Sequence, residues 1–99
     1  MINNLNIDQN VLRRFCKLYH IKKLSLFGSV LTKDFSEHSD IDMLVEFEEG
    51  CKPGYIKYSR ITRELSQIVN RQVDLKTPAE LSKYFREKVI LNSKIAYAG

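Results

Sequence analysis

The chain contains 99 residues, of which 43% are hydrophobic and 28% are charged, and its formal net charge is +4. This length accommodates one small domain with one hydrophobic core, and the composition is typical of a soluble globular protein. No apolar stretch approaches the roughly 18 residues needed to cross a bilayer, so the sequence excludes a transmembrane helix.

The cysteines and the first residues bear on where the protein works. Cys16 and Cys51 lie far apart and lack the paired spacing of a zinc site or a redox dithiol. The amino-terminal residues lack the basic flank and apolar core of a secretory signal. We therefore expect a cytoplasmic protein with free thiols and no membrane partner.

The positive net charge favours anionic partners such as nucleotides or an acidic protein face. The basic residues are scattered, however, and no block of five like charges marks a nucleic-acid-binding tail. Direct nucleic-acid binding is therefore not expected.

Hydrophobic periodicity and capping residues predict alternating helices and strands. Asp8 is a suitable N-cap for the first helix, while Thr77, Pro78 and Glu80 form the pattern that begins the last one. In chain order we expect a helix over 9–20, a strand over 22–27, a helical turn over 30–33, a polar loop over 34–39, a strand over 40–47, a helix over 55–70, a strand over 71–76, a helix over 78–91, and a strand or extended tail over 92–99.

This alternation predicts the fold class. We expect an α/β (α+β) arrangement in which a small mixed β-sheet of about three to four strands has helices packed against it. The chain would form a single domain over residues 1–99.

Two aspartates, Asp40 and Asp42, open the apolar run Met43-Leu44-Val45. In a strand their side chains project from the same face with Cα atoms roughly 7 Å apart, so both carboxylates can reach one cation. Two unneutralised carboxylates on one face of a buried strand would be costly, and a divalent ion removes that cost. The pattern predicts a metal site, and the alternative is an ordinary loop acid at Asp40.

A Gly28-Ser29 turn follows the apolar stretch that ends at Phe27. Glycine lets the backbone approach a ligand closely, and serine adds a hydroxyl group and an N–H group. If a helical turn begins at Val30, its free N–H groups favour a phosphate. Together with the two aspartates, this turn predicts a site for a nucleotide and a metal ion, although Ser29 could instead be a simple helix cap.

The spacing of Gly28-Ser29, ten residues, and then Asp40-Ile41-Asp42 resembles the nucleotidyltransferase superfamily that includes polymerase-β-like enzymes. Within it, the short chain resembles the minimal nucleotidyltransferases, which serve as antitoxins beside HEPN-domain ribonucleases. The resemblance covers nearly the whole chain, and it implies the nucleotidyltransferase fold.

The resemblance also implies a reaction: transfer of AMP from ATP to a hydroxyl group with the help of two Mg²⁺ ions. Asp40 and Asp42 would be metal ligands. Asp74, which interrupts the apolar pair Val73 and Leu75 in a predicted strand, occupies the position of the family's third catalytic aspartate. It would bind metal and act as general base, whereas an exposed edge-strand acid is the alternative.

One position departs from the family pattern. Family members commonly carry an arginine three residues after the motif serine, where this chain has Thr32 followed by Lys33. Threonine does not reproduce the bidentate phosphate grip of arginine, and lysine offers only a point charge. Lys33 is therefore a candidate triphosphate contact, with a solvated loop lysine as the alternative.

Three functions follow from these residues and the resemblance. The first is an adenylyltransferase whose acceptor is a tyrosine of a cognate HEPN toxin, so that the protein acts as an antitoxin. The second is a non-catalytic antitoxin that covers its toxin. Tyr84, Phe85, Val89 and Ile90 on the last helix offer apolar surface for partner binding or oligomerisation, with burial in the domain's own core as the alternative. The third is a small-molecule nucleotidyltransferase of the aminoglycoside-modifying type.

Overall fold

Four strands form one mixed sheet in the computed structural model, which describes residues 7–31 and 40–99. The strand order is β3-β2-β1-β4; β1 is antiparallel to both β2 and β4, whereas β2 is parallel to β3. The elements are α1 (Gln9–Leu18), β1 (Ile21–Phe27), the 3₁₀ helix η1 (Gly28–Leu31), β2 (Ile41–Phe47), α2 (Tyr55–Val69), β3 (Val73–Lys76), the 3₁₀ helix η2 (Pro78–Glu80), α3 (Lys83–Asn92) and β4 (Lys94–Ala98). The predicted small mixed sheet with helices packed against it is confirmed.

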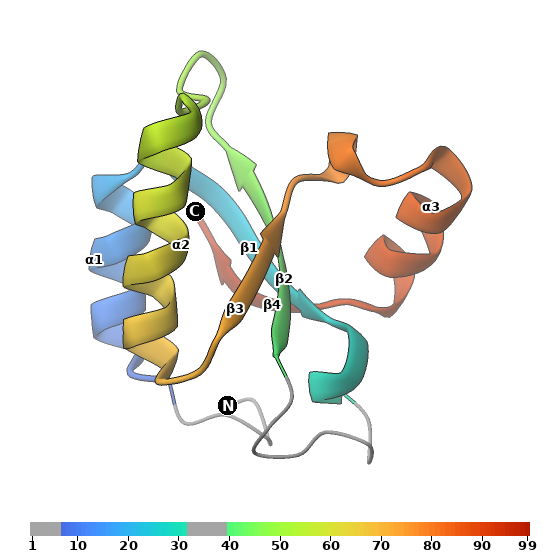
Figure 1. Cartoon of the computed structure of the whole chain (residues 1–99), viewed down its shortest axis with the longest axis horizontal. Coiled ribbons are helices and arrows are strands. Elements are labelled where there is room, and N and C mark those ends of the chain that lie inside the picture. The colour runs from blue at the N-terminus through green and yellow to red at the C-terminus, as the bar shows by residue number, and fades with distance from the viewer. Residues whose placement is uncertain (1–6, 32–39) are drawn as a thin grey trace.

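Helices cover the two faces of this sheet unequally (Figure 1). α1 and α2 lie side by side on one face, and α3 lies on the other. Because side chains alternate along a strand, the central strands contribute one set of apolar residues to the α1–α2 side. The main core comprises Leu12, Phe15, Cys16, Tyr19, Ile21, Leu24, Leu26, Ile41, Met43, Val45, Ile61, Leu65, Val69, Val73 and Leu75.

The α3 face of the sheet holds a smaller apolar cluster. It combines Phe27 from β1 and Leu44 from β2 with Leu81 and Val89 from the α3 side. Asp42 of β2 and Asp74 and Lys76 of β3 share this face of the sheet with the small cluster.

Local chemistry fixes both ends of α1 and the carboxyl end of α2. The Oδ1 atom of Asp8 accepts hydrogen bonds from the N–H groups of Asn10 and Val11, at 2.9 and 3.2 Å, which confirms the predicted N-cap. α1 ends at Leu18, earlier than expected, because His20 adopts a left-handed φ of 57° that a helix cannot continue. Asn70 closes α2 in the same way, with a φ of 56°.

The helix expected over 78–91 is wrong in one respect, because it is two helices. The capping box of Thr77 and Glu80 starts η2, which ends when Leu81 takes an extended conformation with φ −92° and ψ 145°. This break turns Leu81 into the small apolar cluster, and Ser82 then caps α3 by accepting a hydrogen bond from the N–H of Phe85. The tail beyond α3 is the edge strand β4.

The segment between β1 and β2 is described only at its ends. The helical turn expected over 30–33 is η1, which begins at Gly28, while residues 32–39, and with them the expected polar loop, lie outside the described residues. Among the helices that the structure describes, none is long and apolar enough to span a membrane.

Candidate functional site

Asp42 and Asp74 lie directly opposite each other on neighbouring strands. The parallel register pairs Asp42 of β2 with Asp74 of β3. Their neighbours Met43 and Leu75 point into the main core, so alternation places both carboxylates on the α3 face of the sheet. The predicted convergence of acids from two adjacent strands is thus present for this pair.

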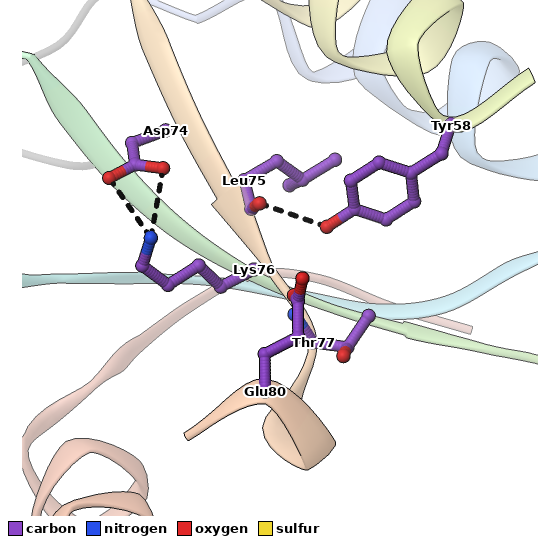
Figure 2. Close-up of polar contacts among 6 residues, drawn as sticks. All are labelled: Tyr58, Asp74, Leu75, Lys76, Thr77 and Glu80. Atoms are coloured by element: carbon purple, nitrogen blue, oxygen red, sulfur yellow. Dashed lines mark hydrogen bonds and ion pairs between the residues drawn. The ribbon is translucent and has the colours of Figure 1, made fainter. Parts of the chain in front are cut away.

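Asp74 is held in place by bonds on either side of it. The hydroxyl of Tyr58 donates a hydrogen bond to the carbonyl of Leu75 at 2.9 Å, as Figure 2 shows. The N–H of Val73 donates to the Oγ atom of Ser66 at 3.1 Å. Both anchors come from α2, so this helix fixes the position of the short edge strand that carries Asp74.

Gly28 borders the pair from the end of β1. Phe27 pairs with Asp42 in the antiparallel register, and Gly28 follows with a φ of +79°, a conformation that favours glycine. A Cβ atom added at Gly28 would collide with Oδ2 of Asp42. The glycine therefore both makes the turn into η1 and leaves room for the carboxylate of Asp42.

Asp40 lies just outside β2. The strand was expected to open at this residue but begins at Ile41, and Asp40 is exposed. Its charge nevertheless acts on Asp42. Of the three predicted acids, two face each other across the strands and the third precedes them in solvent.

The carboxylate of Asp42 is electrostatically disfavoured. Burial raises its pKa above the usual range, and the charges of Asp74 and Asp40 raise it further, while Lys76 acts in the opposite direction. The site therefore carries more negative charge than its own residues neutralise, and a cation would relieve this.

Sequence reasoning missed Lys76. Its Nζ atom lies 3.1 and 3.2 Å from the two carboxylate oxygens of Asp74 (Figure 2). The available signal was the spacing of two residues in a strand, which places Asp74 and Lys76 on one face.

The donor chemistry of this site fits a hard divalent cation. Carboxylate oxygens are the ligands that Mg²⁺ prefers, and the facing Asp42 and Asp74 supply them from two strands. Within residues 7–31 and 40–99, no three His, Cys, Asp or Glu side chains are grouped closely enough to hold a metal ion. The described residues thus offer a pair of facing acids, with Asp74 held by Lys76.

The predicted phosphate side of the site is described only in part. Gly28 and the backbone of Ser29 belong to η1, next to the start of β2. Lys33 and Thr32 lie outside the described residues. Their roles stay predictions.

Comparison with known proteins identifies the family. Residues 9–97 match the family model of the nucleotidyltransferase domain. A Methanocaldococcus jannaschii protein, MJ1379, named as a candidate protein adenylyltransferase, is 33% identical over 93 residues, which cover 90% of this chain and 93% of the relative.

Solved structures share the fold. A structure described as a candidate minimal nucleotidyltransferase superposes with a TM-score of 0.71 at 27% identity, covering 86% of this chain and 85% of the other. A complex of a tri-AMPylated HEPN toxin with an MNT antitoxin from Shewanella oneidensis gives a TM-score of 0.63 at 19% identity, covering 92% and 70%, and this likeness shows the fold alone. With its matched domain, its relative at 33% identity and the fold of a minimal nucleotidyltransferase, this chain belongs to the nucleotidyltransferase family of enzymes.

Proposed function

We propose that this chain, as a single domain, is a magnesium-dependent protein adenylyltransferase that transfers AMP from ATP to a tyrosine hydroxyl of a cognate HEPN toxin. The observation that carries the proposal is the register of Asp42 with Asp74 beside the left-handed Gly28. The name of the relative MJ1379 and the AMPylated toxin in the Shewanella complex support the choice of AMP and of a protein acceptor. A cytoplasmic location, where ATP is available, follows from the same proposal.

The acids on this face would bind the metal ions and deprotonate the acceptor hydroxyl. Asp40, Asp42 and Asp74 would hold Mg²⁺, which when bound neutralises negative charge on the phosphates and on the departing pyrophosphate. Asp74 would also accept the proton of the attacking hydroxyl. The acceptor oxygen bonds to the α-phosphorus as the bond to the bridging oxygen breaks, so pyrophosphate carries away the electron pair.

The turn at Gly28 would receive the nucleotide. With no Cβ at this position, the backbone comes close to the carboxylate of Asp42, so a phosphate bound by Gly28, Ser29 and Lys33 would lie next to the metal ligands. In the proposed reaction the acceptor hydroxyl would come from the toxin.

A labelling experiment tests the proposal. The purified chain is incubated with ATP labelled at the α-phosphate, Mg²⁺ and the HEPN toxin encoded beside it. We expect label on the toxin, loss of its ribonuclease activity, and a decrease of at least about a hundredfold in labelling with Asp42→Asn or Asp74→Asn. The matched control is Glu46→Gln, which removes an acid from another position of β2 and should retain labelling.

A non-catalytic antitoxin is the second candidate. α3 exposes 73% of Tyr84 and 82% of Leu91, whereas Val89 is buried, which was the alternative expected for this group of residues. The threonine at position 32, in place of the family arginine, also favours this candidate. Toxin neutralisation that survives Asp42→Asn with no transferred label would establish binding alone.

A further inference from the structure

Lys76 is positioned to neutralise the acidic face from within the chain. Its Nζ atom contacts both oxygens of Asp74, at 3.1 and 3.2 Å, so the ammonium group lies astride the carboxylate (Figure 2). The two side chains retain 39% and 48% of their exposure. An ion pair this exposed contributes little to stability, so it can be broken at low cost.

The charge of Lys76 also reaches Asp42. The parallel register places Leu44 opposite Lys76 and Asp42 opposite Asp74, so the lysine projects from the same face as both acids. Its positive charge favours the ionised form of Asp42, against the opposing effects of Asp74 and Asp40. The positive charge of Lys76 therefore acts on the carboxylates of both Asp74 and Asp42.

An ammonium group and a metal ion compete for the same oxygens. A protonated lysine has three donors and no lone pair, so it cannot join the carboxylates in coordinating a metal ion. A divalent cation that binds Asp74 does so at oxygens that Lys76 already contacts, and the repulsion between the cation and the ammonium charge favours departure of the lysine.

We propose that Lys76 is the internal counter-ion of the Asp42–Asp74 pair and that a divalent cation displaces it from Asp74 on binding. The inference rests on the proposed function for the identity of this face as the metal site. Lys76 is thus a positioning residue: it keeps the acids together before the metal binds, and it lowers the affinity of the free protein for the metal.

Manganese binding tests this role without nucleotide or acceptor. Mn²⁺ is titrated into the full chain, and the free ion is followed by electron paramagnetic resonance. Because one exposed ion pair and one nearby positive charge are removed, we expect Lys76→Met to bind Mn²⁺ about threefold to tenfold more tightly than the wild type. Lys76→Arg keeps the charge and should keep the wild-type affinity or weaken it.

The control separates this local effect from net charge. Lys17→Met removes the same charge from an exposed position on α1, on the opposite face of the sheet, and should change Mn²⁺ affinity by less than about 1.5-fold. Lys76→Gln replaces Lys76→Met if the methionine variant does not fold. Equal or weaker Mn²⁺ binding by the neutral variants, or no Mn²⁺ binding by any protein, would overturn the inference.

The labelling experiment above distinguishes this inference from the proposed function. If Lys76→Met binds Mn²⁺ more tightly but the wild type transfers no AMP, the counter-ion role of Lys76 is supported and the proposed enzyme activity is contradicted. If the wild type transfers AMP but Lys76→Met binds Mn²⁺ with unchanged affinity, the proposed enzyme activity is supported and the counter-ion role of Lys76 is contradicted.

Discussion

Gly28 serves the site at the scale of a single residue in two separable ways. Its φ of +79° strains any other residue, and a Cβ there would meet the Asp42 carboxylate. Gly50 has nearly the same φ, +78°, but no atom within 4 Å of an added Cβ. Both glycines therefore need a positive φ, but only at Gly28 would a Cβ atom also collide with the Asp42 carboxylate.

This difference makes a paired prediction. Gly28→Ala and Gly50→Ala should each lower the free energy of unfolding by about 1 kcal/mol, because alanine is strained at positive φ. Only Gly28→Ala should also weaken Mn²⁺ binding and AMP transfer, since it displaces Asp42. Urea unfolding and Mn²⁺ titration measure the two effects, and equal Mn²⁺ affinity in both variants would contradict the steric role of Gly28.

Asp42 predicts a pH dependence of stability. Its pKa is raised above the ordinary value of 3.8, so the folded state binds this proton more tightly than the unfolded chain does. The contribution of Asp42 to the free energy of unfolding is therefore fully present below pH 3.8, and it is lost as pH rises through the raised pKa of the folded state. Asp42→Asn should match the wild type at about pH 3 and exceed it near neutrality, by an amount that solvent screening keeps below about 1 kcal/mol.

Urea unfolding across this pH range, without divalent ions, checks the sign. Glu46→Gln removes an acid elsewhere in β2 and provides the comparison. A wild type that gains stability over Asp42→Asn with rising pH would show that Asp42 is stabilised by its surroundings.

At the scale of elements, the strands could be predicted because their apolar residues are grouped in short runs in the sequence. Asp42 lies between the apolar Ile41 and Met43 of β2, and Asp74 lies between the apolar Val73 and Leu75 of β3, so the sequence itself indicates that these acids face away from the main core. The break between η2 and α3 could not be foreseen in this way. It depends on Leu81 turning toward Phe27 and Leu44, which are distant in sequence.

The candidate site could likewise be predicted only in part: the sequence indicates which acids belong to it but not how they are paired. The motif spacing predicted Asp40 and Asp42, and the family resemblance predicted Asp74. The parallel register that sets Asp42 opposite Asp74 depends on how β3 docks beside β2. Lys76 was missed because nothing local distinguishes a lysine that contacts an acid from a lysine in solvent. The ion pair exists only once the strand places both side chains on one face.

Arg86 holds the break between η2 and α3 in place. Its Nε atom donates to the carbonyl of Pro78 at 2.7 Å, and a terminal nitrogen donates to the carbonyl of Leu81 at 3.1 Å. Arg86→Ala should cost about 1.5–3 kcal/mol, the value of hydrogen bonds to a charged group. Faster amide exchange in α3 should accompany this loss, whereas Lys83→Ala on the same helix should change neither.

At the scale of the whole molecule, Cys16 reports on the integrity of the core. It is completely buried in the main core, and burial raises the pKa of its thiol to about 12. Cys51 is only partly buried. A thiol reagent near pH 8 should therefore modify Cys51 quickly and Cys16 only when the fold opens, because the thiolate is the reactive form.

Mass spectrometry of the modified protein measures both rates. Addition of urea should accelerate the reaction of Cys16 in parallel with global unfolding. Rapid modification of Cys16 in the native protein would show that α1 detaches from the sheet without unfolding of the remainder.

The pairing of β1 with β4 joins Lys23 to Ala98, so a central strand is completed by an element that comes last in the described chain. While the protein is being synthesised, the outer edge of β1 stays bare until β4 has emerged and docked. Bare strand edges readily pair with other chains. Chaperone demand should therefore be greatest in the nascent chain, and any modification that delays the docking of β4 should favour aggregation over folding.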